Sequence, residues 1–263
     1  SLTIQVRYQD QIGMLGRVTS AVGRAGADIR GIDFVGASHG EVTRDFTVNV
    51  RDADHAESLL RTLRRLPKVR VLHSTDRTML LHNRGKIQIT PRVPLSSHHD
   101  LLMLYTPGVA RVSEAIHARR DRVFDLTIKS NAVAIVTDGT AVLGLGNVGP
   151  HAALPVMEGK SLLFREFGNV DAFPLCVVAH SADDLVFLCQ AIAPTFGGIN
   201  LEDIAAPRCF EVQDRLRAEM QIPVFHDDQD GTAAVVLGAL INALRVVHKD
   251  LRSVKMVVSG AGA

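Results

Sequence analysis

Five acidic side chains in the last third of the sequence could bind a divalent cation. They form two groups, Glu202 with Asp203, and Asp227 with Asp228 and Asp230. Each group directly follows an apolar run, and carboxylates at the carboxyl ends of α/β-sheet strands face the usual ligand crevice. Converging carboxylates repel one another unless a cation neutralises them, and Mg²⁺ and Mn²⁺ prefer oxygen ligands. The pattern therefore predicts a metal site.

The same acids also have a structural interpretation. Asp203 and Asp228 precede expected helices, where an acidic side chain stabilises the helix dipole. From the local pattern alone, the two interpretations are comparable.

Two other side chains could transfer protons. Tyr105 stands just before Thr106-Pro107, a pair that suits a helix cap and first turn, so its ring would more often pack over the helix end. Lys160 follows Gly159 near a helix, where a lysine is usually solvated. It becomes a candidate base only if burial lowers its pKa.

The elements before residue 83 predict a small sheet with two helices. Alternating apolar residues indicate a strand over 2–8, and helical spacing follows over 14–25. Further strands are expected at 29–35, 42–50 and from 69, with a helix capped by Asp54 between the last two. This βαββαβ order is the split ferredoxin-like arrangement.

From residue 101 strands and helices alternate, which predicts an α/β sheet. Strands are expected at 132–136, 175–178, 222–225 and 254–259. The last of these runs into Gly260, Ala261, Gly262 and Ala263. A strand followed by G-x-G is how a dinucleotide-binding unit begins, although alone it is a weak signal. Because the sequence stops before the helix of such a unit, we expect it to be a fragment.

Composition excludes several classes of protein. Of 263 residues, 46% are hydrophobic and 22% charged, the net charge is +1, and tryptophan is absent. These values are ordinary for a globular protein and argue against disorder or a nucleic-acid-coating function. The three cysteines form no CxxC pair, so we expect reduced thiols in a cytoplasmic protein. No run suits a signal peptide or a membrane span.

Five segments taken together resemble the N-terminal catalytic domain of bacterial malic enzymes. They are 104–110, 139–147, 156–160, 194–204 and 223–229. The resemblance covers residues 101–263 and implies oxidative decarboxylation of malate to pyruvate and CO₂, with Mg²⁺ or Mn²⁺ and with NAD or NADP. One departure is Asp230, at a position where the family motif often has histidine.

The resemblance also implies roles for individual residues. Tyr105 would be the general acid and Lys160 the general base, with Asp227 beside the base. The implied metal ligands are Glu202, Asp203 and Asp228. In this chemistry the base removes the malate hydroxyl proton, and the acid protonates C3 after CO₂ leaves. A base must be neutral, so we expect the pKa of Lys160 to fall from about 10.4 toward ~7–8.

Segment 10–18, with 26–29, resembles an ACT domain, a ligand-sensing module of metabolic enzymes. The family places its ligand site after the first strand, usually across a dimer interface. This implies an effector site at Gly13 and Met14 for a small carboxylate or amino acid, and a homodimer or larger homo-oligomer. A glycine there would let a helix N-terminus approach a carboxylate closely. A purely structural pairing domain is an equal alternative.

We therefore predict a mixed α/β protein with an ACT-like domain over 1–82, a linker over 83–100 and a malic enzyme catalytic domain over 101–252. The rest, 253–263, would begin an NAD(P)-binding domain, and without its remainder we expect this chain to be inactive. The expected ligands are malate and pyruvate, without nucleic-acid or membrane partners. The rival functions are a non-catalytic metabolite sensor and an oxaloacetate decarboxylase without net redox.

Overall fold

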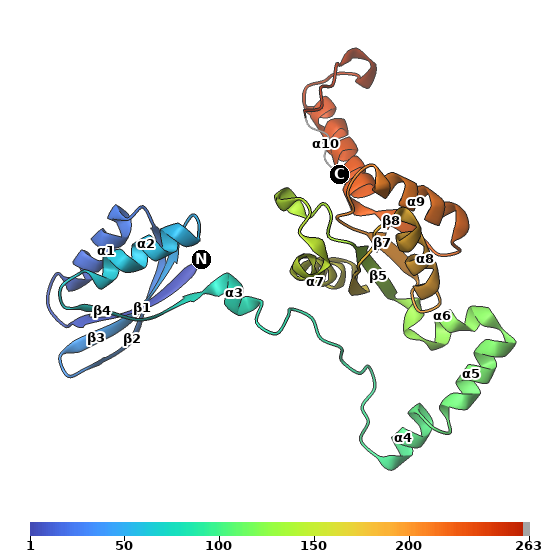
Figure 1. Ribbon diagram of the computed structural model, residues 1–263, viewed down its shortest axis with the longest axis horizontal. Helices are drawn as coiled ribbons and strands as arrows, with labels where there is room; N and C mark the ends of the chain where they lie inside the picture. Colours follow the sequence, from blue (N-terminus) through green and yellow to red (C-terminus); the bar gives the residue numbers. More distant parts are fainter. Residues whose placement is uncertain (260–263) are drawn as a thin grey trace. The chain divides into compact units, whose positions relative to one another are not determined.

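The computed structural model describes residues 1–259 and contains two compact units (Figure 1). The first unit comprises Ser1–Gly85, and the second begins at Lys86. The predicted fold class, a ferredoxin-like domain followed by an α/β domain, is confirmed.

The first unit is an antiparallel sheet with two helices on one face (Figure 1). Its elements are β1 (Leu2–Gln9), α1 (Met14–Arg24), β2 (Asp28–Ser38), β3 (Glu41–Asn49), α2 (Ala53–Arg64), β4 (Val69–Asp76) and the short α3 (Arg77–Leu81). The strand order is β2-β3-β1-β4, with antiparallel pairing throughout. The first six elements follow the predicted βαββαβ order.

Alternation along β1 forms the core of this unit. Every second side chain, from Leu2 to Tyr8, is buried against the two helices, and those between are half-buried. This is the period-2 pattern that predicts a half-buried strand. The predicted cap of α2 is wrong by two residues, because the side chain of Asp52, and not that of Asp54, accepts the backbone hydrogen of His55.

The second unit contains a parallel four-stranded sheet in the order β6-β5-β7-β8. Its strands are β5 (Ala132–Thr137), β6 (Asp171–Cys176), β7 (Gly198–Leu201) and β8 (Val224–His226). Its helices are α4 (His98–Leu104), α5 (Val109–Ala118), α6 (Val123–Leu126), α7 (Gly149–Gly168), α8 (Ala182–Ile192), α9 (Arg208–Glu219) and α10 (Thr232–Val246). Strands alternating with helices give the parallel sheet that the sequence predicts.

Three predicted strands of this unit need correction. The strand expected at 222–225 starts two residues later, as β8, and ends at His226. The strand expected at 175–178 starts earlier, as β6, and ends at Cys176. The strand expected at 254–259 is wrong, because these residues form no regular secondary structure and pair with no strand of the described chain. A strand is stabilised by ladder hydrogen bonds to a neighbour, so an apolar run without a neighbour stays irregular.

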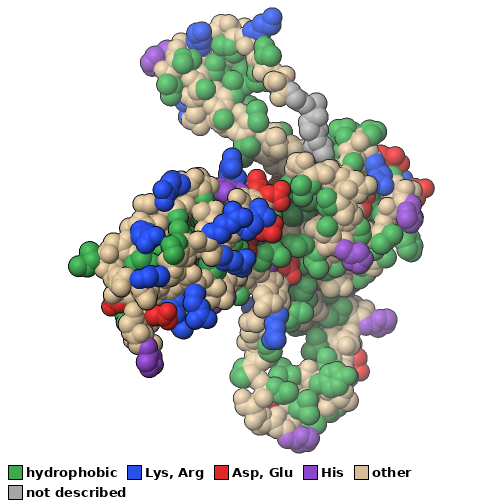
Figure 2. Space-filling model, turned by 60° about the vertical axis from the view of Figure 1, so that its left-hand side comes forward, with side chains coloured by type: hydrophobic (Ala, Val, Ile, Leu, Met, Phe, Trp, Pro, Cys, Tyr) green, Lys and Arg blue, Asp and Glu red, His purple; other side chains and the backbone are tan. Residues whose placement is uncertain are grey.

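Several helices of the second unit expose apolar side chains. Within α4, α5 and α10 no residue is buried, and Met103 and Val235 are 62% and 69% exposed. Hydrophobic side chains also appear at many places on the face that Figure 2 shows. Across residues 1–259, no helix combines the length and apolar character that crossing a membrane requires.

Candidate active site

The topology of the parallel sheet brings the predicted acids to one edge. The chain runs from β5 to β6 on one side and then returns to place β7 on the other side of β5. Such a reversal of strand order opens a crevice at the carboxyl ends of the strands. Glu202 and Asp203 directly follow β7, and Asp227 and Asp228 directly follow β8, so all four reach this crevice.

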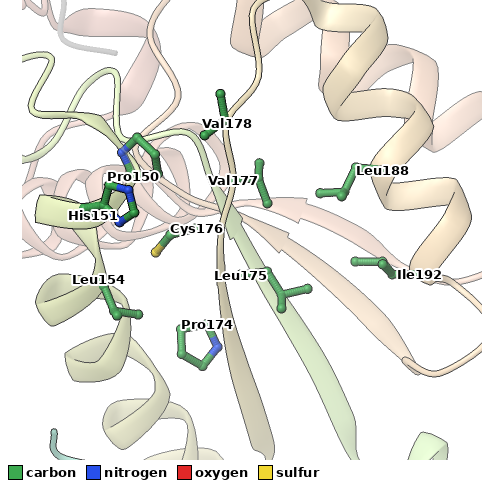
Figure 3. A pocket seen from close by; sticks show the side chains of 10 residues that line it. All are labelled: Pro150, His151, Leu154, Pro174, Leu175, Cys176, Val177, Val178, Leu188 and Ile192. Carbon is green, nitrogen blue, oxygen red and sulfur yellow. The ribbon is translucent and has the colours of Figure 1, made fainter. Parts of the chain in front are cut away.

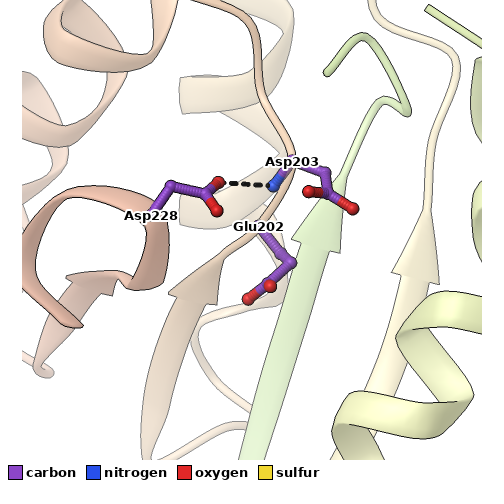
Figure 4. A group of neighbouring side chains, drawn as sticks. All are labelled: Glu202, Asp203 and Asp228. Atoms are coloured by element: carbon purple, nitrogen blue, oxygen red, sulfur yellow. Dashed lines mark hydrogen bonds between the residues drawn. The ribbon is translucent and has the colours of Figure 1, made fainter. Parts of the chain in front are cut away.

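Glu202, Asp203 and Asp228 converge closely (Figure 4). Each offers one carboxylate oxygen within 4.8 Å of those of the other two. Glu202 and Asp203 are 5% and 6% exposed, and the backbone nitrogen of Asp203 donates to Asp228 Oδ2 at 3.0 Å. We name these three side chains the acid cluster.

The electrostatics of the acid cluster favour a cation. Burial, only partly offset by hydrogen bonds from Lys160 and Asn200, raises the pKa of Glu202 to about 7. Burial and the neighbouring charge of Asp228 raise the pKa of Asp203 to about 6. Asp203 Oδ2 is buried and has no hydrogen-bond partner among the described residues. An orphaned oxygen in an all-oxygen donor set fits a hard divalent cation such as Mg²⁺ or Mn²⁺.

Lys160 reaches the acid cluster from the side. Its helix, α7, packs on β6 and β5 and directs the ammonium to Asp227 Oδ2 at 2.6 Å and to Glu202 Oε1 at 2.9 Å. Burial alone would lower the pKa of Lys160, but the hydrogen bonds and charges of these two carboxylates outweigh burial and raise it. The predicted fall in the pKa of Lys160 presupposed a neighbouring metal cation; beside these two carboxylates alone, the pKa shifts upward instead.

A cavity of about 530 Å³ adjoins the acid cluster. It is lined by Thr140, Ala141, Leu143, Gly146, Val156, Glu202, Asp203, Asp228 and Thr232. Segment 139–147, one of the five segments of the resemblance, is a turn that thus contributes Leu143 and Gly146 to the wall. Gly139, at the start of this turn, has φ +71°, and a Cβ there would lie 2.4 Å from the carbonyl oxygen of Gly149. A larger residue would force the turn apart.

Tyr105 is not brought to the acid cluster. It follows the last residue of α4, its side chain is 67% exposed, and its hydroxyl makes no hydrogen bond within the described chain. The tight turn after α4 is fixed by the backbone, since Gly108 N donates to the carbonyl oxygen of Leu102 at 2.9 Å. The structure therefore joins the predicted base, Lys160, to the acids and leaves the predicted acid, Tyr105, apart from them.

Asp230 faces away from the acid cluster. Its Oδ2 accepts hydrogen bonds from Gln213 Nε2 at 2.5 Å, from Arg217 at 2.7 Å and from the backbone nitrogen of His226 at 3.1 Å. These contacts tie the turn after β8 to α9. The carboxylate that departs from the family motif thus has a cationic partner of its own.

The other predicted site residues lie elsewhere. Gly13 caps α1 with φ +88°, a left-handed conformation that glycine adopts without strain. Met14 is buried in the core of the first unit, so its side chain does not line an open surface. The predicted cofactor-binding residues Gly260, Ala261, Gly262 and Ala263 lie outside the described residues.

A second cavity, of about 360 Å³, lies beside β6, the outer strand of the sheet (Figure 3). Leu154, Leu175 and Ile192 contribute to its mostly apolar lining. Burial raises the pKa of its one thiol, Cys176, to about 11, so this sulfur stays protonated and poorly nucleophilic at neutral pH. The two cavities thus differ in chemistry, because carboxylates line the one at the acid cluster and none lines the one beside β6.

Sequence reasoning missed several residues around the acid cluster. Asn200, on β7, donates to Glu202 Oε2 at 2.9 Å and so orients that carboxylate. Asp138, Thr140 and Arg208 form a further network beside it. One signal was available, since Asp138-Gly139-Thr140 follows a buried strand just as the acid pairs do.

Two family models match the chain, one for each unit. Residues 1–73 match the model of the ACT domain, and residues 84–186 match that of the malic enzyme N-terminal domain. The first match lies within the ferredoxin-like unit, and the second includes β5, β6 and Lys160.

Curated relatives and solved structures agree with these matches. An NAD-dependent malic enzyme of Geobacillus stearothermophilus is 48% identical over 263 residues, 100% of this chain and 55% of the relative. An NADP-dependent malic enzyme of Escherichia coli is 50% identical over 68% of this chain and 24% of the relative. The crystal structure of an NAD-dependent malic enzyme from Thermotoga maritima matches with a TM-score of 0.67 and 47% identity, over 69% of this chain and 48% of that one.

All of this chain matches the Geobacillus relative, but it spans only about half of that protein's length. The predicted family is confirmed by the two domain matches and by this similarity along the whole chain. The chain carries an ACT domain followed by the N-terminal domain of the malic enzyme family, and it is homologous to bacterial NAD-dependent malic enzymes over its full length.

Proposed function

We propose that the protein to which this chain belongs oxidatively decarboxylates malate to pyruvate and CO₂ with NAD or NADP. The observation that carries the proposal is the contact of Lys160 with the acid cluster, 2.9 Å from Glu202, at the crevice of the parallel sheet. A base beside a cation site is what removal of a proton from a metal-held hydroxyl requires. Relatives with this domain are named NAD- and NADP-dependent malic enzymes, which supports the same reaction.

In this proposal Glu202, Asp203 and Asp228 hold Mg²⁺ or Mn²⁺. The bound ion would polarise the hydroxyl and carboxylate oxygens of the substrate as a Lewis acid. Its ligands come from the ends of two adjacent strands, so the sheet itself sets their spacing. Thr232 lines the same cavity, and its hydroxyl can donate a hydrogen bond to a substrate carboxylate, whereas the single hydroxyl proton of Thr140 is donated to Asp138.

Lys160 is the proposed base, and Asp227 its proton partner. As described, Lys160 is held protonated by two carboxylates. If Glu202 served as a metal ligand, its charge would be neutralised by the ion, and Lys160 would keep only one anionic partner, which would lower its pKa. Asp227 Oδ2, 2.6 Å from the ammonium, is then within reach to receive the proton that Lys160 must release before it acts as a base.

Tyr105 is the proposed acid, by motif. Its exposed position after α4 requires a rearrangement or an added element before its hydroxyl can reach a substrate at the acid cluster. A phenol is neutral and carries a proton at neutral pH, so it is suited to donate to carbon C3.

An activity assay of the full-length protein tests the reaction. With malate, Mn²⁺ and either NAD or NADP, we expect pyruvate and reduced nucleotide in equal amounts, and removal of Mn²⁺ by EDTA should abolish both. Pyruvate from oxaloacetate but none from malate would instead identify a decarboxylase without net redox. Absence of both reactions would favour the metabolite sensor.

We further propose that the first unit binds a small carboxylate or amino-acid effector near Gly13, at the N-terminus of α1, and self-associates. Its match to the ACT family and the left-handed φ of Gly13 support this. We also propose that the ACT-like domain spans 1–82, the linker 83–100 and the catalytic domain 101–252, and that 253–263 begin an NAD(P)-binding domain.

Deleting residues 1–82 from the full-length enzyme is expected to remove any response of malate oxidation to amino acids while leaving basal activity. The measurement is the initial rate over a panel of amino acids and small carboxylates, with the intact enzyme as control. An unchanged response would place regulation outside the first unit.

A further inference from the structure

A buried carboxylate outside the acid cluster lies at the end of β5. Asp138 accepts hydrogen bonds from Thr140 Oγ1 at 2.6 Å and from the Thr140 backbone nitrogen at 3.1 Å. Arg208 donates to its other oxygen, and the Asp138 side chain is 1% exposed. A buried charge costs folding free energy unless it is paired and hydrogen-bonded, and here all of its contacts are made within one short loop and one arginine.

Thr140 connects this carboxylate to the loop that carries the acid cluster. Its hydroxyl donates to Asp138 and accepts from the backbone nitrogen of Ala205 at 2.9 Å and from Arg208 at 3.3 Å. The next residue, Ala141, donates its backbone nitrogen to the carbonyl oxygen of Asp203 at 3.0 Å. The loop after β5 is thus hydrogen-bonded to the loop after β7 at the residues on both sides of Ile204.

These hydrogen bonds matter because the backbone of Asp203 adopts an unfavourable conformation. Its φ is +53°, in the left-handed region that a residue with a Cβ rarely adopts. Such a conformation is sparsely populated and persists where the surrounding contacts enforce it. The nitrogen of Asp203 is bound to Asp228 and its carbonyl to Ala141, so these bonds set the direction of the carboxylate.

The position of Arg208 gives an independent reason to connect it with Asp138. Arg208 is the first residue of α9, where a cation is disfavoured by the positive end of the helix dipole. Its guanidinium is instead turned to Asp138 and Thr140, and its side chain is only 24% exposed. The hydrogen bonds to Asp138 and Thr140 therefore account for an arginine at a helix position that disfavours cations.

We propose that Asp138, Thr140 and Arg208 are positioning residues that hold the strained Asp203 in place as a ligand of the divalent cation. The inference rests on the proposed function, because it requires Asp203 to bind the metal. None of the three needs to touch the ion, since the effect passes through the backbone of residues 203–205.

The test is Mn²⁺ titration of the full-length protein, with unbound Mn²⁺ measured by electron paramagnetic resonance. Thr140→Val, which removes the hydroxyl at nearly constant volume, is expected to raise the Kd about tenfold, the size of effect that loss of an outer contact of a metal ligand produces. Thr140→Ser keeps the hydroxyl and should bind as the unaltered protein does. Activity of Thr140→Val should return at saturating Mn²⁺, with kcat restored.

Asp138→Asn separates positioning from direct contact, because Thr140 lines the cavity and Asp138 does not. An equal loss of Mn²⁺ affinity in Asp138→Asn supports the inference, and it decides the matter if Thr140→Val does not fold. Unaltered affinity in Asp138→Asn, or the same loss in Thr140→Ser as in Thr140→Val, overturns the inference. Failure of the unaltered protein to bind Mn²⁺ overturns the proposed metal site itself.

Discussion

Lys160→Ala is expected to lower the rate of malate oxidation by the full-length enzyme by about 10²–10⁴-fold, the usual contribution of a general base. The reason is geometric, since Lys160 donates to both Glu202 and Asp227. Steady-state rates with malate, Mn²⁺ and nucleotide measure the effect. Lys249→Ala is the matched control, because Lys249 is an exposed lysine just past the end of α10.

The acid and the base can be separated by a second reaction. Exchange of the C3 protons of pyruvate needs proton transfer at carbon but no hydride transfer. Tyr105→Phe should slow this exchange. In a separate measurement, Lys160→Ala should still bind Mn²⁺, because Lys160 is not among the proposed ligands. If Tyr105→Phe left the exchange intact and Lys160→Ala abolished it, the two assignments would have to be reversed.

Asp228→Asn is expected to raise the Kd for Mn²⁺ by more than about 100-fold, since losing an outer contact of a ligand alone costs about 10–100-fold. The variant removes one of three negative charges whose oxygens lie within 4.8 Å of one another. It also weakens the acceptor of the hydrogen bond from the backbone nitrogen of Asp203. The proposed ligand Asp203 is then less firmly positioned. Isothermal titration with Mn²⁺ measures the change.

Asp230→Asn is the matched control, with the same substitution two residues away. Its carboxylate binds Gln213 and Arg217, so we expect nearly unchanged Mn²⁺ affinity. Because Arg217 is 47% exposed, loss of this ion pair should lower the free energy of unfolding by about 1 kcal/mol or less. Equal losses of Mn²⁺ affinity in the two variants would refute the assignment of Asp228 as a ligand.

Most elements, and the residue types of the site, could be predicted from the amino-acid pattern alone. Alternation in β1 and helical spacing in α1 are local patterns, so the βαββαβ order followed without tertiary information. Paired acids after apolar runs likewise predicted that Glu202, Asp203, Asp227 and Asp228 would reach the same edge of a sheet. Local hydrophobic periodicity was sufficient for the order of elements in the first unit, but it left a helix-dipole role for Asp203 and Asp228 equally open.

Which carboxylate joins the acid cluster and which forms an ion pair elsewhere became clear from the three-dimensional contacts. Asp228 and Asp230 are only two positions apart, yet the turn after β8 directs them differently. Asp228 belongs to the acid cluster, whereas Asp230 pairs with Arg217. The raised pKa of Lys160 and the strained φ of Asp203 also depend on contacts between residues distant in sequence. Charge interactions and backbone strain are set by distances in space, which neither periodicity nor spacing along a chain contains.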